Sequence, residues 1–143
     1  MSGFEIRITD EKSEGCRTTE LVLGSDMERF ATSLSFWSAE DFYAHWFENL
    51  GRALAGKRGI LIESLDGPLE ALNFVLMWVM YPVDDVVYFQ EQFFKIPPDL
   101  KEIKNIGDHL EELELVNEDG DRISTWSVSR KAIEDFIADR NMR

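Results

Sequence analysis

The segment Trp37–Gly56, WSAEDFYAHWFENLGRALAG, carries the strongest structural signal in the chain. Ser38 is a residue type that caps helix N-termini, and Asp41 stands three positions later, where its carboxylate can bond back to the Ser38 N–H. Trp37 and Phe42 occupy the positions at which apolar side chains pack across such a cap. The pattern predicts a helix that begins directly after Ser38.

Apolar residues then recur at intervals of three and four, which places them on one face of this helix. They are Phe42, Trp46, Leu50, Ala53 and Leu54. Gly56 can adopt the left-handed conformation that ends many helices, so the helix is expected over about residues 39–55. Its single apolar face predicts that it lies across a sheet.

The residues before this helix indicate an antiparallel meander of three strands. Residues 4–9 alternate apolar and polar side chains, as a half-buried strand does. Residues 10–17 are polar and are interpreted as a turn region. The chain is expected to return as a second strand over residues 18–23 and a third over residues 28–35.

The residues after the helix indicate further strands. Residues 59–65 form a short apolar run, and residues 72–81 are nearly all apolar, which is typical of a central strand covered on both faces. Asp84 and Asp85 then provide a tight turn into an alternating strand over residues 86–94. These two longer strands are expected to form a hairpin.

The C-terminal third predicts a second hairpin and a last helix. Residues 113–116 and 122–128 flank the turn-forming pair Asp119-Gly120. Ser129 is placed to cap a helix over about residues 130–139. The whole chain is therefore predicted to be one α+β domain, residues 1–143, with a mainly antiparallel twisted sheet of about five to seven strands and two helices.

The composition limits the classes of partner. The chain has 28 acidic and 15 basic residues, so its formal net charge is -13. Such a surface repels phosphate backbones and anionic lipid headgroups, which argues against direct binding of nucleic acid or membrane, and it attracts basic proteins. The acidity is equally explained as a means of keeping the protein soluble.

The cysteine content, the N-terminal residues and the length of the apolar runs indicate a cytoplasmic protein. The single cysteine, Cys16, cannot form an internal disulfide, and the N-terminal residues have neither a positive start nor an apolar run. The longest apolar run, residues 71–83, is shorter than the roughly 20 residues that a membrane span needs. The sequence therefore predicts a cytoplasmic protein.

No motif for catalysis, a cofactor or a metal is present in the sequence. His45 and His109 are the only side chains with an ordinary pKa near neutrality, and neither has a second His or a Cys at zinc-ligand spacing. There is no glycine-rich phosphate loop or nucleophile elbow. We expect no cofactor and no enzymatic activity. The alternative is a small enzyme that uses His45 or His109.

An excess of acidic residues lies between Pro97 and Asp121, where two lysines face nine carboxylates. The nine are Asp99, Glu102, Asp108, Glu111, Glu112, Glu114, Glu118, Asp119 and Asp121. If they share a face with Asp84, Asp85 and Glu91, they form a negative surface suited to a basic cleft. The alternative is a set of solvated loops.

Several segments, in this order, resemble the immunity proteins of bacterial contact-dependent growth inhibition systems. They cover about residues 36–136 and are residues 37–46, residues 60–64, Asp66-Gly67-Pro68, residues 78–81, residues 87–90, Glu118-Asp119-Gly120 and residues 123–126.

The resemblance implies a cytoplasmic antidote that forms a heterodimer with the C-terminal toxin domain of a cognate inhibitor protein, usually a nuclease, and blocks its active site. A nuclease needs a basic cleft, and carboxylates of an acidic inhibitor can pair with its Lys and Arg groups. The expected partner-binding residues are Asp84, Asp85, Glu91, Glu111, Glu112 and Glu114. A cytoplasmic adaptor or chaperone for a secreted protein is the other alternative.

Overall fold

The computed structural model describes residues 3–141 and confirms an α+β fold in which all strands pair antiparallel. The N-terminal sheet consists of β1 (Phe4–Ser13), β2 (Cys16–Leu23) and β3 (Asp26–Ser33). The C-terminal sheet consists of β4 (Gly59–Ile62), β5 (Phe74–Val83), β6 (Val86–Lys95) and β7 (Trp126–Ser129). The helices are α1 (Ala39–Leu54) and α2 (Arg130–Asn141), with short 3₁₀ helices η1 (Leu69–Ala71) and η2 (Ile103–His109).

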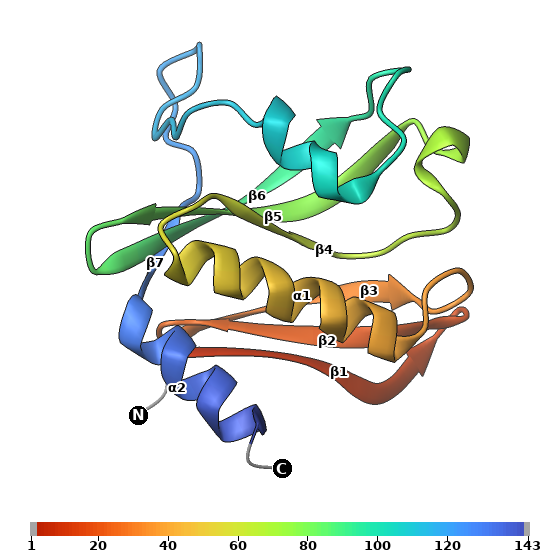
Figure 1. Ribbon diagram of the computed structural model, residues 1–143, viewed down its shortest axis with the longest axis horizontal. Coiled ribbons are helices and arrows are strands. Elements are labelled where there is room, and N and C mark those ends of the chain that lie inside the picture. The colour runs from red at the N-terminus through yellow and green to blue at the C-terminus, as the bar shows by residue number, and fades with distance from the viewer. Residues whose placement is uncertain (1–2, 142–143) are drawn as a thin grey trace.

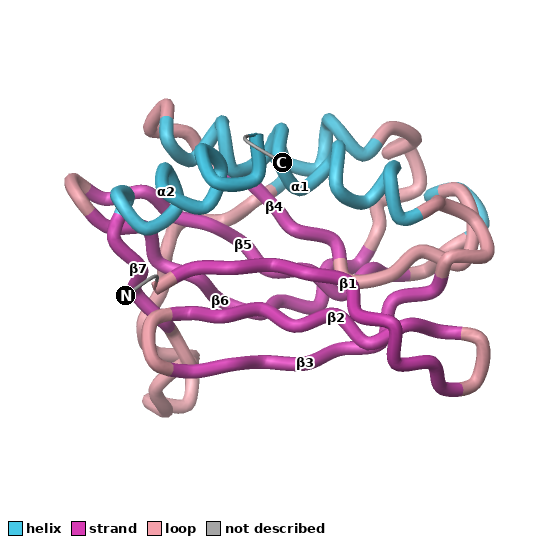
Figure 2. Tube along the Cα trace, turned by 90° about the horizontal axis from the view of Figure 1, so that it is seen from below, coloured by secondary structure: helices cyan, strands magenta, loops and turns pink. Residues whose placement is uncertain are grey.

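The number of strands and their antiparallel direction agree with the sequence prediction, but the strands are divided between two sheets (Figure 1). Both α-helices lie on the same side of these strands, as Figure 2 shows. No helix within residues 3–141 is long and apolar enough to cross a membrane.

The N-terminal meander is confirmed, with a longer first hairpin than expected. β1 continues to Ser13 through most of the predicted turn region, and the chain reverses at Glu14 and Gly15. Both residues adopt positive φ, 51° and 82°, the left-handed geometry that fits a two-residue hairpin turn. The polar residues here therefore form the exposed end of a strand pair.

The start of α1 matches the sequence prediction. The Asp41 N–H donates to Ser38 Oγ at 3.1 Å, and the Ser38 N–H donates to Asp41 Oδ2 at 3.0 Å. Trp37 and Phe42 pack edge to face across the cap with ring centroids 5.1 Å apart. Gly56, at φ 84°, follows the end of the helix.

Replacing Ser38 by Ala is expected to lower the free energy of unfolding by about 1 kcal/mol, because the Asp41 N–H loses its acceptor. Urea unfolding followed by circular dichroism measures this change. Ser25→Ala, in the exposed turn between β2 and β3, is the control and should have no comparable effect. An equal loss in both variants would contradict a specific role of the cap.

Side chains of α1 satisfy the free edge of β4, which is the outer strand of its sheet. The Trp46 indole N–H donates to the Ile62 carbonyl at 2.9 Å, and the Ile62 N–H donates to His45 Nε2 at 3.1 Å. The Ile60 N–H donates to Asn49 Oδ1 at 2.9 Å. The helix therefore replaces a neighbouring strand, which leaves this edge unavailable for pairing with another chain.

The predicted second hairpin forms only at its tip, where the Asn117 N–H donates to the Asp121 carbonyl at 2.8 Å and the Ile123 N–H donates to the Leu115 carbonyl at 2.9 Å; its predicted pairing along residues 122–128 is wrong. Among the described residues, its two arms share one isolated bridge, Val116 with Arg122, while β7 pairs with β6 from Phe89–Trp126 to Val86–Ser129. Trp126 packs edge to face on Trp78 at 5.3 Å. The edge of β6 is free and lies beside an apolar surface. β7 therefore buries more apolar surface by pairing with β6 than it would in an isolated two-stranded hairpin.

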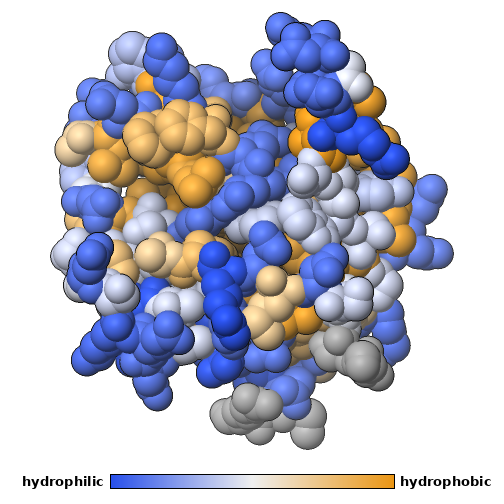
Figure 3. Space-filling view, turned by 180° about the vertical axis from the view of Figure 1, so that it is seen from behind, coloured by the Kyte–Doolittle hydropathy of each residue, from blue (hydrophilic) through white to orange (hydrophobic). Residues whose placement is uncertain are grey.

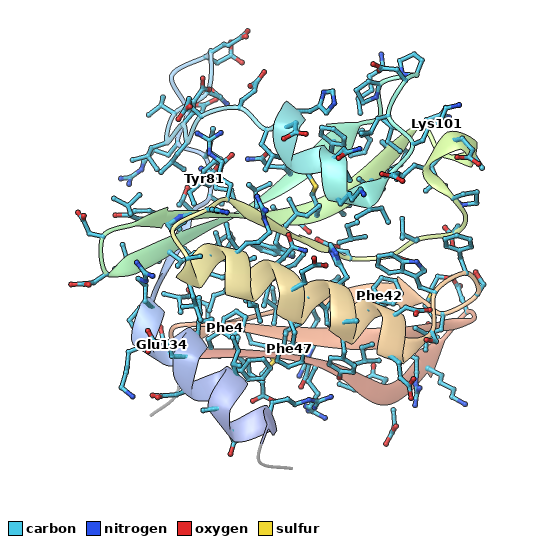
Figure 4. All side chains as sticks on the ribbon, viewed as in Figure 1. Phe4, Phe42, Phe47, Tyr81, Lys101 and Glu134 are labelled. Atoms are coloured by element: carbon cyan, nitrogen blue, oxygen red, sulfur yellow. The ribbon has the colours of Figure 1, made fainter. Side chains whose placement is uncertain are left out.

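The two sheets share one core. Phe4 of β1 stacks on Phe89 of β6 with ring centroids 5.7 Å apart and meets Phe136 of α2 edge to face at 5.3 Å. Phe47 of α1 also packs on Phe136, with stacked rings whose centroids are 5.6 Å apart. Phe4 and Phe47 thus lie where α1, α2 and the N-terminal sheet meet (Figure 4). The C-terminal sheet is fixed in place by these contacts.

Candidate functional site

The structure distributes the six predicted partner-binding residues over three places. Asp84 and Asp85 form the two-residue tip of the β5–β6 hairpin, and both are exposed. Asp84 has φ 54°, and the main chain of the tip is fixed by α2, whose Arg130 N–H donates to the Asp85 carbonyl at 2.9 Å. The two carboxylates are therefore held out at the end of the sheet.

Glu111, Glu112 and Glu114 lie on the loop that connects η2 to β7, and all three are exposed. The main chain of this loop is anchored to the sheet by buried side chains. The Tyr81 hydroxyl donates to the Glu111 carbonyl at 3.3 Å, and Gln90 Nε2 donates to the Glu114 carbonyl at 2.7 Å. The loop therefore lies over the face of the sheet that carries Tyr81 (Figure 4).

Glu91 lies on the opposite face of the same sheet. It is opposite Trp78 in the register of β5 and β6, and side chains alternate between faces along a strand. Its neighbours Gln90 and Gln92 point toward the loop, where Gln92 Nε2 donates to the Tyr81 hydroxyl at 3.0 Å. The condition that Glu91 shares one face with the acidic loop is therefore not met, and whether Glu91 contacts a partner stays a prediction.

Most of these carboxylates have no basic partner. Among residues 3–141, Glu112 forms an ion pair with Arg58 at 2.5 Å, while the other five form no salt bridge. Arg58 also lies over the Tyr81 ring, 5.7 Å from its centroid. The four exposed carboxylates of the hairpin tip and the loop therefore add to the negative field of the chain, which is available to a basic partner, and Glu91 adds a negative charge on the opposite face of the sheet.

A seventh carboxylate, Glu63, lies beside Glu91 and was missed by the sequence analysis. It follows β4 and is 4% exposed. Burial, followed by the neighbouring Glu91 carboxylate, raises the pKa of Glu63 to about 9. A neutral Glu63 therefore donates its proton toward Glu91 at pH 7. A charged residue inside an otherwise apolar run was the available signal.

The two histidines have different surroundings. His45 is 7% exposed, and burial lowers its pKa to about 4, so it stays neutral and accepts the Ile62 N–H. His109 is exposed and packs edge to face on Phe94 at 6.4 Å. His45 thus supports β4, and within residues 3–141 no cluster of three or more His, Cys, Asp and Glu side chains is placed to hold a metal.

A pocket of about 350 Å³ lies between α1 and η2. Its lining mixes acidic Asp41 and Glu48 with basic Arg52, Arg58 and Lys104. None of the six predicted residues lines it. With three basic and two acidic side chains, the lining does not form a uniformly charged ion site.

Comparison with known proteins agrees with the family resemblance found in the sequence. The family model described as the CdiI N-terminal domain matches residues 32–136. A curated relative, the "Immunity protein CdiI" of Enterobacter cloacae subsp. cloacae, is 28% identical over 137 residues, which cover 91% of this chain and 90% of the relative. A chain of the solved CdiA-CT/CdiI toxin and immunity complex from Enterobacter cloacae is 25% identical, with a TM-score of 0.81 and full coverage of both chains.

Proposed function

The chain belongs to the CdiI N-terminal domain family, and from this premise we propose that it neutralises the C-terminal toxin domain of a cognate CdiA protein. The toxin domain is a nuclease with a basic active-site cleft, and the chain blocks that cleft with its acidic surface. The solved relative from Enterobacter cloacae comes from a complex of a toxin with its immunity protein, which supports this kind of partner.

The uncompensated carboxylates carry the proposal. Five of the six predicted contact residues form no salt bridge within residues 3–141, in a chain of net charge -13. An inhibitor that faces lysines and arginines evolved to bind phosphates can satisfy them with such carboxylates. The exposed ones also raise the rate of diffusional encounter with a basic protein.

The proposal is tested with the purified toxin domain encoded beside this chain. Equimolar chain is expected to abolish nuclease activity on total RNA or on plasmid DNA, and co-expression is expected to restore growth of cells that produce the toxin. Binding without loss of nuclease activity would contradict occlusion of the active site. Absence of binding and of growth rescue would contradict the proposed partner.

The double variant Glu111→Lys, Glu114→Lys is expected to reduce the association rate constant about tenfold at 50 mM salt and much less at 500 mM salt, because exposed charges act at a distance and are screened. Surface plasmon resonance measures the association rate constant at both salt concentrations. Glu11→Lys, Glu134→Lys is the control, since it makes the same change in net charge away from this loop. Equal losses in both would show that net charge alone matters.

A further inference from the structure

One face of the C-terminal sheet is only partly covered. Phe74, Leu76, Trp78, Glu91 and Phe93 share this face by register and alternation. Toward β7 it is covered by the N-terminal sheet, through the stack of Phe4 on Phe89. Toward the start of β5 it is open, and Figure 3 shows apolar side chains gathered there on the surface.

The open part is an aromatic surface. Phe93 is 66% exposed and Phe74 is 48% exposed, and their rings stack with centroids 4.1 Å apart. Leu76, 37% exposed, lies opposite Phe93 in the neighbouring strand. Exposed aromatic rings in contact with each other are unusual on a monomer and are typical of the centre of a protein interface.

A carboxyl pair lies next to this aromatic surface. The Glu63 side chain is buried beside the exposed Glu91, and Glu28 of β3 places a third carboxyl group nearby, whose negative charge also raises the pKa of Glu63. Neither Glu63 nor Glu91 forms a salt bridge within residues 3–141. Three carboxyl groups from three different segments thus converge where no cation compensates them.

Two buried polar atoms at this place also lack hydrogen bonds. The Trp78 indole N–H lies close enough to Glu63 to lower its pKa, but neither Trp78 Nε1 nor Glu63 Oε2 makes a hydrogen bond of normal geometry within the described residues. A buried polar atom without a partner costs free energy in the folded chain. The site is therefore incomplete in the isolated protein.

We propose that Glu91 and Glu63, with the stacked rings of Phe74 and Phe93, form the anchor site of this chain for one arginine side chain of the toxin domain. This inference rests on the proposed function, because the toxin domain supplies the arginine. The planar guanidinium pairs with the carboxylates, and its flat surface lies against the exposed Phe93 ring. Pairing releases the Glu63 proton to solvent, and the guanidinium keeps its charge throughout.

This anchor site and the acidic loop have different roles. The solvated loop carboxylates act mainly before contact, on the association rate, whereas a desolvated aromatic and carboxylate site acts mainly on the dissociation rate. Arginine and aromatic side chains are the commonest residues at such energetic centres. The acidic loop therefore raises the association rate, and the anchor site lengthens the lifetime of the complex.

The test measures the Kd of the complex with the purified toxin domain for Glu91→Gln and for Phe93→Thr, both on an exposed strand face that tolerates polar residues. Each variant is expected to weaken binding by about tenfold or more, chiefly through faster dissociation. Glu134→Gln, on α2 (Figure 4), and Val83→Thr, an exposed apolar residue at the far end of β5, are the matched controls with unchanged Kd.

Proton release gives a second readout. The wild-type Kd is expected to fall as the pH rises from 7 to 8.5, and Glu63→Gln, which has no proton to release, is expected to lose this dependence. Wild-type binding with unchanged Kd in Glu91→Gln and Phe93→Thr would overturn the anchor site and leave the proposed function intact. Absence of binding by the wild-type chain would overturn both.

Discussion

Glu63→Gln is expected to raise the free energy of unfolding at pH 7 by ~3 kcal/mol. Burial and Glu91 raise the pKa of Glu63 from its ordinary 4.5 to about 9 in the folded chain. The folded chain therefore binds one proton more than the unfolded chain between these two values, and stability is lost as the pH rises through this window. Glutamine has the shape of the protonated side chain and does not titrate.

Urea unfolding at pH 5, 7 and 8.5 measures the effect. The gain from Glu63→Gln should be under about 1 kcal/mol at pH 5 and should grow to ~5 kcal/mol at pH 8.5. A gain of the same size at every pH would indicate better packing instead of a removed titration. A destabilised variant at pH 8.5 would contradict the raised pKa altogether.

The titration of His45 is expected to change the free energy of unfolding with pH in the opposite direction from that of Glu63. Burial lowers its pKa from 6.5 to about 4, so the unfolded chain binds the extra proton and stability falls as the pH decreases below 6.5. In a Glu63→Gln background, the free energy of unfolding should fall by ~2 kcal/mol between pH 7 and pH 5. The Glu63→Gln substitution removes the titration of Glu63, which would otherwise offset this loss.

Adding His45→Gln to that background is expected to abolish the loss between pH 7 and pH 5, because glutamine can accept the Ile62 N–H without binding a proton. His109→Gln is the matched control, since it makes the same substitution at an exposed histidine. Urea unfolding of the three variants separates the two histidines. A pH dependence that disappears with His109→Gln would contradict the assignment to His45.

The titration of Glu63 also bears on function. A carboxyl group whose pKa is raised by burial lowers the stability of the folded chain at neutral pH, so it has no structural advantage over glutamine. Residues that lower stability often serve binding or catalysis. Glu63→Gln is therefore expected to have two effects with one cause, a higher free energy of unfolding and the loss of the pH dependence of toxin binding.

Local signals in the sequence determined the elements of this fold. The capping box at Ser38 and Asp41 fixed the start of α1, because both hydrogen bonds form between residues three apart. Alternation located the meander, and the Asp84-Asp85 turn joined β5 to β6. Each of these features is decided by neighbours in the chain, so composition and spacing were sufficient to predict it.

The partner of β7 could not be predicted in this way. The nearest candidate in sequence, residues 113–116, makes one bridge, whereas β6 makes the sheet with β7. The choice depends on which edge is free and on the apolar surface beside it, and both exist only after β5 and β6 have packed on the core. The division of the strands between two sheets, where one was predicted, likewise depends on how the strands pack and could not be read from local patterns.

The candidate site shows the same division between chain and fold. The amino-acid sequence by itself determined the net charge, the acidic loop, the long helix and the family, since these depend on residue types and their order. Only the tertiary structure placed Glu91 on the face opposite that loop and buried Glu63 beside it, because side-chain direction follows from strand register and a carboxyl pKa follows from burial and charged neighbours.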